Sequence, residues 1–407
     1  MPSPLDAQQI RGRTRGARNQ ASIVVAIGTI LSNEGWGQLT AAAVGREAEL
    51  SKSAVRQRGA SPASLAQLVW EAGLGEGLIR SLTAVVQALD DACTTGNTDL
   101  LAGAWLRLTR QSVDQDAAVE LLAASNVVPE LAAFVQPDFA TVLNLPSDDD
   151  SDHSYRGVRV AYAMSLALGI LLTNRYPWAQ DPGMAAALRL RANALLVTSA
   201  PVELPAADSS HMSEDPTIVR EDMALDGLLR ATLALISEFG YDAVTVKQIA
   251  AAAQATEGLI FSRYSNKLAL VTDAIHRQDT DGWQLNAAFM RGIEIEHGLP
   301  IAEAVYLREA TRPEHRTAQR MKIEQIRLSW HTPELLREAI DRLADFRSAL
   351  VLEPGWGQIE TEADFYCDVA APLGALLLPR LHPSAHTLPW DVVTVPLFEA
   401  MRAQVRT

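Results

Sequence analysis

The sequence predicts an all-α protein built from two tandem copies of one helical unit. Apolar residues recur at helical spacing along nearly the whole chain, whereas alternating strand patterns and two-residue hairpin turns are scarce. The second half also repeats the first when the sequence is shifted by 205 positions. The 407 residues, 48% of them hydrophobic, are enough for two helical domains with their own cores.

The repeat is clearest in one ungapped block. Residues 35–65 fall on residues 240–270, so that glycine, threonine, alanine and leucine positions coincide. The same shift places residues 168–172 on residues 373–377, while the register between the two blocks drifts by a few residues. A repeat this long indicates duplicated domains, because the repeats of a solenoid are only tens of residues long.

Each half begins with a helix that has one apolar face. The face comprises Ile23, Ile27, Ile30 and Leu31 in the first half, and Leu225, Leu228, Leu229, Thr232, Leu235, Ile236 and Phe239 in the second. A segment rich in proline, serine and acids lies between the halves and is typical of a linker. The predicted boundaries are an arm and first head at 1–66, a first helical body at 67–200, the linker at 201–216, a second head at 217–270 and a second body at 271–407.

Residues 240–270 predict a helix-turn-helix. Thr245, followed three residues later by Gln248, forms a capping box that starts one short helix. Thr256 is the N-cap of a second short helix, and Ser265-Asn266 caps a third that begins at Lys267. Two short helices joined by a tight turn and flanked by longer ones describe this motif.

This segment resembles the DNA-binding head of the TetR-type family of bacterial regulators. The positions that carry the resemblance are Gly240, Thr245, Ile249-Ala250, Ala253, Thr256, Gly258, Ile260-Phe261, Tyr264, Lys267 and Leu270. The resemblance implies a three-helix head on a helical ligand-binding and dimerisation body, and a protein that acts as a homodimer. Two unlike copies in one chain are similar to a covalently joined pseudo-dimer, which implies an asymmetric DNA site; a higher oligomer is left open. The family resemblance also implies that four helices, near 158–175, 183–199, 363–380 and 390–404, pack as a bundle.

The resemblance implies DNA contacts from the second head. The residues are Thr245, Lys247, Thr256, Glu257, Gly258, Phe261, Arg263 and Lys267. Phe261 stands where the family usually has a tyrosine that binds a phosphate, and Arg263 stands where it often has histidine. Glu257 either accepts a hydrogen bond from a cytosine amino group or is a solvated surface charge. Without the resemblance, Thr245 is a plain N-cap and Lys267 a surface lysine.

The first head departs further from the family pattern but is more basic. Arg56 replaces the aromatic residue, Gly59 removes the buried one and Pro62 replaces the lysine, so we expect looser packing. The candidate DNA contacts of this head and its arm are Arg11, Arg13, Arg15, Arg18, Thr40, Ser51, Lys52, Ser53, Arg56 and Arg58. The arginine-rich arm either enters a minor groove or binds phosphates, or it is a solvated tail.

Charge is distributed unevenly along the chain. The formal net charge is -14, but residues 1–58 hold eight basic and four acidic residues, and residues 223–278 hold five of each. The acidic excess therefore lies outside the two predicted heads and does not exclude binding to double-stranded DNA. It does favour a rival hypothesis, in which the fold persists as a ligand- or protein-binding module that has lost specific DNA binding.

The remaining expectations concern ligands and location. Aromatic residues that either line a small-molecule pocket or belong to the core are Trp105, Trp178, Trp283, Tyr306 and Trp330. The sequence contains no catalytic or metal-binding motif and none that would bind a cofactor, so we do not expect an enzyme. The predicted function is that of a regulator, and we expect a repressor that an unknown small-molecule effector releases from DNA. The apolar segment 22–31 recurs in the middle of the chain, so we do not expect it to be an export signal. The apolar run 160–173 is too short to span a membrane. We therefore expect a cytoplasmic protein.

Overall fold

The computed structural model contains helices and no strand in the residues it describes, which confirms the all-α prediction. The described residues are 4–143, 155–197, 202–206, 223–351, 362–381 and 383–405. Within these ranges, side chains are described except at 4–15, 155, 223–224, 279–284, 349–351, 383–384 and 402–405. The chain forms two compact units, one of residues 1–80 and 111–138 and the other of residues 81–110 and 139–407.

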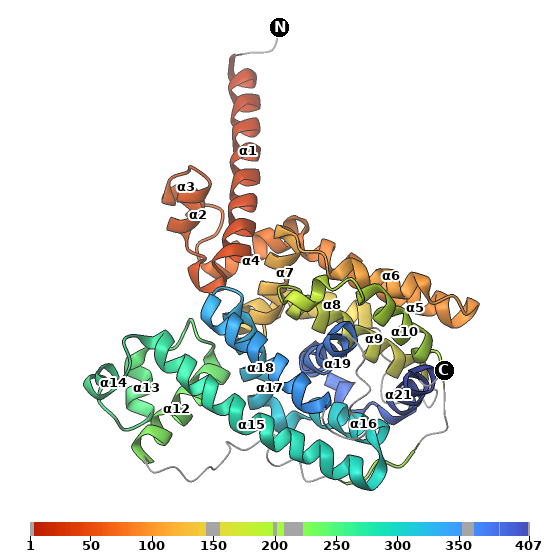
Figure 1. Ribbon diagram of the computed structural model, residues 1–407. Coiled ribbons are helices and arrows are strands. Elements are labelled where there is room, and N and C mark those ends of the chain that lie inside the picture. The colour runs from red at the N-terminus through yellow and green to blue at the C-terminus, as the bar shows by residue number, and fades with distance from the viewer. Residues whose placement is uncertain are drawn as a thin grey trace. The chain divides into compact units, whose positions relative to one another are not determined.

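The helices of the first half follow one another with short connections (Figure 1). They are α1 (Pro4–Asn33), η1 (Trp36–Gln38), α2 (Ala41–Glu47), α3 (Lys52–Arg56), α4 (Pro62–Val69), η2 (Trp70–Leu74), α5 (Gly75–Thr95), α6 (Asp99–Leu108), α7 (Val113–Ala124), α8 (Pro129–Leu143), α9 (Tyr155–Thr173), η3 (Pro177–Gln180) and α10 (Met184–Leu195).

The second half has a similar order of elements. They are α12 (Met223–Phe239), α13 (Val246–Ala252), α14 (Glu257–Arg263), α15 (Lys267–His297), α16 (Leu299–Ala310), η4 (Pro313–His315), α17 (Arg316–Ser329), α18 (Pro333–Val351), α19 (Glu362–Ala375), α20 (Leu378–Leu381), η5 (Pro383–Thr387) and α21 (Asp391–Val405).

The predicted apolar faces of the two leading helices are largely buried. All four predicted residues of α1 are at most 1% exposed, and Leu228, Leu229, Thr232 and Ile236 of α12 are also buried. Phe239 was predicted on the same face but is 46% exposed, because it lies at the end of α12 where the chain turns away. The helical period therefore identifies the face correctly and fails at the last turn of the helix.

Four long helices of the second unit pack on one another. α9 lies along α19, and α10 contacts both α19 and α21, while α21 also contacts α9 (Figure 1). Their bounds fall close to the four segments for which the resemblance implies a bundle. Two of these helices come from each half of the sequence, so the halves share one apolar core here.

The backbones of α9 and α19 touch at a pair of glycines. A Cβ added to Gly169 would lie 1.7 Å from the carbonyl oxygen of Ala370, and one added to Gly374 would lie 1.8 Å from that of Ser165. Gly169 and Gly374 are 205 positions apart, and so are Ser165 and Ala370. The contact is therefore reciprocal, as in an interface between two copies related by a two-fold axis.

α9 is longer than the apolar run that marked it in the sequence. The window 156–173 of α9 is long and apolar enough to cross a membrane, and so is the bent pair α7–α8 if it is one span. Its apolar window is 89% buried inside the protein, mainly against α19. A core helix that is covered on all sides is apolar around its whole circumference for the same reason as a membrane span.

The beginning of the predicted linker is bound to the second half. The Val202 amide donates to Asp391 Oδ2 (2.9 Å), and the Pro205 carbonyl accepts from Arg308 (3.0 Å). Most of the predicted linker lies outside the described residues.

Candidate nucleic-acid interface

The second head has the helix starts that its sequence predicts. Thr245 caps α13 and forms the complete capping box with Gln248, while Thr256 Oγ1 accepts the Leu259 amide at 3.1 Å. The Asn266 side chain caps α15, which begins at Lys267. Each cap satisfies backbone N–H groups that a helix start otherwise leaves without a partner, so three turns of chain are fixed locally.

The turn between α13 and α14 needs one left-handed residue. Gln254 has φ 52°, and the Ala255 amide donates to the Ala250 carbonyl at 2.9 Å. Ile249 and Ala250 of α13 and Ile260 of α14 are buried together in the core of the head. This packing leaves the opposite face of α14 free of the core.

The exposed face of α14 presents most of the predicted contact residues of the second head. Thr256, Glu257, Gly258, Phe261 and Arg263 are all exposed, as are Thr245 and Lys247 at the start of α13. Leu259 is 40% exposed and Phe261 52%, so apolar groups also occupy this face. Leu259 was not among the predicted site residues, because an apolar residue on a short helix is ordinarily assigned to the core.

Lys267 is held inside the head. Its ammonium donates to the carbonyls of Tyr241 and Val244, each at 2.8 Å, and lies 3.9 Å from the centre of the Tyr241 ring. Burial lowers the pKa of Lys267, with Asp242 and Glu324 opposing that effect. The resemblance implies a phosphate contact here, and that stays a prediction. In the structure, Lys267 ties the α12–α13 loop to α15 through two of its three N–H groups.

A second tie joins the end of α14 to α15. The Tyr264 hydroxyl donates to Asp273 Oδ2 at 2.6 Å, and Arg277 donates to Asp273 Oδ1 at 2.9 Å. Burial alone would raise the pKa of Asp273, but the hydrogen bonds from Arg277 and Tyr264 outweigh it and hold that pKa below its usual value. The carboxylate is thus ionised at neutral pH and fixes α14 on its support.

A buried glutamate connects the second head to its body. Glu324 Oε1 on α17 accepts the Tyr241 amide at 2.7 Å, directly after Gly240, whose φ is 78°. Arg327 donates to both oxygens of Glu324 and also to Asp242 at 2.7 Å. Sequence reasoning missed this network, because charged residues on an amphipathic helix are ordinarily solvated.

The first head contains the same local devices at equivalent positions. Thr40 and Ser51 cap α2 and α3, and Glu49, which corresponds to Gln254, has φ 55°. The Leu50 amide donates to the Gly45 carbonyl at 2.7 Å, as Ala255 does to Ala250 in the second head. Ser61 caps α4 with a complete capping box, as its sequence predicts for Pro62 at the first helical position.

The first head is also joined to its body by a buried glutamate. Glu120 Oε1 on α7 accepts the Trp36 amide at 2.7 Å, directly after Gly35, whose φ is 85°. Glu120 is fully buried, like Glu324. In each half, a buried glutamate of the body therefore accepts the backbone amide that follows a left-handed glycine, at the same distance of 2.7 Å.

Packing in the first head explains its missing aromatic residue. A Cβ added to Gly59 would lie 2.6 Å from the Leu65 side chain, so Leu65 occupies the space beside Gly59. Leu65 and Val55 are fully buried, so the core of the first head is closed beside Gly59.

The basic residues of the first head are exposed. The exposed basic residues are Lys52, Arg56 and Arg58, and the three hydroxyl residues Thr40, Ser51 and Ser53 are exposed as well. Arg58 donates to Gln20 Oε1 at 3.1 Å and to the Gly16 carbonyl at 3.5 Å, so it binds α1. The arginine-rich arm is helical and forms the beginning of α1. Arg18 is exposed, and the side chains of Arg11, Arg13 and Arg15 lie outside the described ones.

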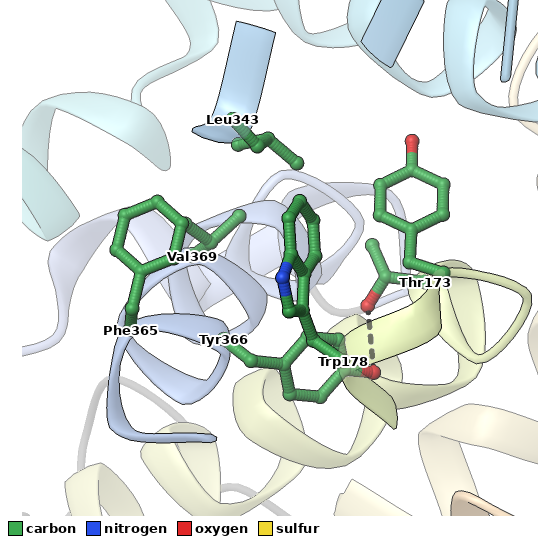
Figure 2. A pocket seen from close by; sticks show the side chains of 7 residues that line it. Thr173, Trp178, Leu343, Phe365, Tyr366 and Val369 are labelled. Atoms are coloured by element: carbon green, nitrogen blue, oxygen red, sulfur yellow. Dashed lines mark hydrogen bonds between the residues drawn. The ribbon is translucent and has the colours of Figure 1, made fainter. Parts of the chain in front are cut away.

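The aromatic residues predicted to line a ligand pocket do not form one group. Trp178 is one of seven side chains around a crevice that is too narrow to hold a water molecule, with Thr173 on one side and Leu343 of α18 at one end (Figure 2). The Thr173 hydroxyl donates to the Tyr366 hydroxyl at 2.9 Å, and the Trp178 and Phe365 rings meet edge to face at 6.2 Å. Residues of both sequence halves line this crevice.

The other predicted aromatic residues have structural partners. Trp105 is fully buried and donates to the Ala163 carbonyl, and Trp330 donates to the Leu172 carbonyl, each at 3.0 Å. Tyr306 is partly exposed, and burial followed by the charge of Glu303 raises its pKa to about 12. The Trp283 side chain lies outside the described ones. Among the described residues, no group of three or more histidine, cysteine, aspartate or glutamate side chains could hold a metal ion.

Comparison with known families identifies the second head. Residues 228–274 match the family model described as "Bacterial regulatory proteins, tetR family". The match covers α12, α13, α14 and the beginning of α15, and it supports a TetR-family DNA-binding regulator in general. A comparison with curated proteins finds no match.

Proposed function

We propose that this protein is a transcriptional regulator that reads an asymmetric DNA site with two unlike helix-turn-helix heads. The observation that carries the proposal is the agreement between the first head and the second, which matches the family model. Both heads have the same caps, the same left-handed turn residue and the same buried glutamate at equivalent positions. Local geometry this detailed supports a second helix-turn-helix in the first half.

The two heads would bind DNA by different chemistry. α3 carries Lys52 and Arg56, with Arg58 directly after it, and positive side chains at a groove bind phosphates regardless of sequence. α14 presents Leu259 and Phe261, and apolar side chains in the major groove contact thymine methyl groups. We expect the first head to supply more of the salt-dependent affinity and the second to supply base selectivity.

One chain would replace the usual dimer. The reciprocal contact of Gly169 with Ala370 and of Gly374 with Ser165 is what a two-fold interface between copies produces. α9 and α10 of the first half and α19 and α21 of the second would form the bundle that joins the two copies. Two heads that are covalently linked through this bundle need not be alike, and so can bind unlike half-sites.

A titration with the DNA upstream of the protein's own gene tests the proposal. Fluorescence anisotropy at 50 and 200 mM salt should show specific binding whose affinity falls steeply with salt. The paired substitution of Lys52 and Arg56 by glutamine should reduce the salt dependence by about two ion contacts. Equal, weak affinity for upstream and unrelated duplexes would contradict the proposal.

The rival function is a ligand- or protein-binding module that has lost specific DNA binding. Two observations favour it. The Lys267 ammonium donates to two carbonyls inside the head, and Phe261 lacks the hydroxyl that the family usually has there. Under this alternative the same titration shows no specific binding, while the fold is unchanged.

Regulation by a small molecule would follow from a population shift. An effector that binds the body must favour the arrangement of heads that does not fit DNA, since equal affinity for both arrangements shifts nothing. In this proposal the protein is a cytoplasmic repressor, and the crevice around Trp178 is one place where a ligand would have to open the packing.

A further inference from the structure

Three arginines gather at the start of α17 in the second unit. Arg316 and Arg320 lie one turn apart on α17 and so share a face of that helix, and Arg380 belongs to α20. Arg316 is exposed, whereas Arg320 and Arg380 are partly buried. Nothing in the proposed DNA interface uses these residues.

The three positive charges affect one another. Burial lowers the pKa of Arg320, and the neighbouring charges of Arg316 and Arg380 lower it further. Burial and the charge of Arg316 likewise lower the pKa of Arg380. The one carboxylate that opposes these effects at Arg320 is Glu238, in the last turn of α12. Like charges that repel in a partly buried place destabilise the protein unless an anion joins them.

Two of these guanidinium groups also contain buried donors without a partner. The Nε atoms of Arg320 and Arg380 are buried, and neither atom has a hydrogen-bond partner within the part of the chain that the structure describes. Arg191 differs, because its terminal nitrogens bind Asp364 and Asp368 although its own Nε is unpartnered. Buried donors in folded proteins nearly always have a partner, so two unsatisfied ones in one cluster indicate a missing acceptor.

The start of α17 adds to the positive potential. This 14-residue helix follows η4 directly, so the Arg316 amide already donates to the Pro313 carbonyl, and the Glu309 carboxylate lies 3.6 Å from the N-cap residue His315. The contribution of the helix start is therefore that of its dipole and not of free N–H groups.

We propose that Arg316, Arg320 and Arg380 form a binding site for a small phosphate-like or dicarboxylate anion. Arginine suits this ligand because its planar group donates two parallel hydrogen bonds to one anion. Two of the three arginines are partly buried, which favours a small anion over the backbone of a nucleic acid.

The site lies next to the joint of the second head. Arg320 is one turn from Glu324, which accepts the Tyr241 amide, and it is attracted by Glu238 two residues before Gly240. A bound anion competes with Glu238 for Arg320 and so acts on the end of α12. The consequence for DNA affinity rests on the proposed function, whereas binding of the anion does not.

Isothermal titration calorimetry and thermal unfolding of the full chain without DNA test the site. Sodium phosphate and sodium succinate are the probes, each compared with sodium chloride at the same ionic strength. We expect at least one probe to bind and to raise Tm beyond the chloride control. Arg320→Gln and Arg380→Gln should each weaken that binding at least ten-fold, and each should raise Tm without a probe because repulsion is relieved.

Two further variants make the result decisive. Arg316→Gln is exposed, so it should fold normally and still weaken binding, and the exposed Arg337→Gln on α18 should behave like the wild type. The proposal is overturned if neither probe stabilises the wild type beyond chloride, or if the cluster variants respond as Arg337→Gln does. It is also overturned if only duplex DNA, and neither small anion, binds through these arginines. Loss of DNA binding with intact phosphate binding would contradict the proposed function alone.

Discussion

Single side chains decide how firmly each head is attached. In the second half, the Asp273 carboxylate holds the end of α14, because it accepts hydrogen bonds from both Tyr264 and Arg277. The Glu324 carboxylate holds the connection between head and body, because it accepts from the Tyr241 amide and from Arg327. These ties connect the reading helix to a rigid support, which a DNA-binding head needs because base contacts depend on accurate placement.

Removal of the Tyr264 hydroxyl should loosen α14. Tyr264→Phe loses a hydrogen bond to a carboxylate and should reduce the free energy of unfolding by about 1–2 kcal/mol at pH 7. Tyr241→Phe is the matched control and should change it by less than ~0.5 kcal/mol, since Lys267 still lies over a ring and over the same carbonyls. Urea denaturation of both variants measures the difference. Equal stability of the two variants would contradict the role assigned to the Tyr264 hydroxyl.

The same carboxylate predicts a pH dependence. The pKa of Asp273 is lower in the folded protein than in the unfolded chain, so the unfolded state binds more protons around pH 4. The stability that Asp273 contributes is therefore present above pH ~4 and is lost as pH falls through its folded pKa. The stability difference between wild type and Asp273→Asn should shrink between pH 6 and pH 3. A difference that does not change over this range would contradict the assignment.

A buried carboxyl in the body predicts the opposite trend. Burial, then the charges of Asp368 and Glu294, raise the pKa of Glu303 to about 8, and Arg191 only partly offsets them. The folded state then keeps a proton that the unfolded state loses above pH ~4.3, so stability falls as pH rises from about 4.5 to 8 and levels off beyond. Glu303→Gln should remove this slope, as thermal unfolding across that range would show. A slope that survives the substitution would assign it to another group.

At the scale of elements, the contact between α9 and α19 is the most constrained place in the fold. The two helices approach until carbonyl groups occupy the space that a Cβ would need at Gly169 and Gly374. The family resemblance implied a bundle that includes both helices, but the apolar run 160–173 did not itself predict which helix would cover it. That choice depends on backbone contact, which hydrophobic periodicity does not encode.

Substitution of either glycine should force these helices apart. Gly374→Ala places a Cβ 1.8 Å from the Ser165 carbonyl oxygen and should destabilise the protein by about 3 kcal/mol or more. Gly227→Ala in α12 has open space around its new Cβ and should stabilise by roughly 0.5–1 kcal/mol, because alanine favours helices. Differential scanning calorimetry compares the two. If Gly374→Ala gains stability as Gly227→Ala does, the close crossing is absent.

Across the whole molecule, the sequence could predict what short-range patterns carry. The helices, the caps at Thr245 and Thr256 and the repeat of residues 35–65 in residues 240–270 depend on neighbours within a few positions. The buried glutamates Glu120 and Glu324 could not be predicted, because their partners lie more than 80 residues away. The expected phosphate contact of Lys267 rested on resemblance, and tertiary contacts give that ammonium other partners.

The packing of the two halves on each other leads us to expect that the protein is a monomer in solution. Each half contributes two helices to the packing of α9, α10, α19 and α21. In the proposed pseudo-dimer, these contacts within the chain take the place of a separate partner. The free protein should therefore sediment as a monomer of 44.0 kDa. A dimer whose mass persists on dilution would show that a further face mediates association.

The central claim, that one polypeptide reads DNA with two unlike heads, is tested most directly by selection of binding sites from random duplexes, combined with native mass spectrometry of the selected complex. We expect one chain per duplex and a consensus without a palindrome, in two parts whose centres are about one helical turn (~34–36 Å) apart. Replacing Leu259 and Phe261 of α14 by alanine should erase one part of the consensus and keep the other, because these side chains are the ones expected to contact bases. A palindromic consensus bound by two chains, or a consensus that both heads read alike, would contradict the claim.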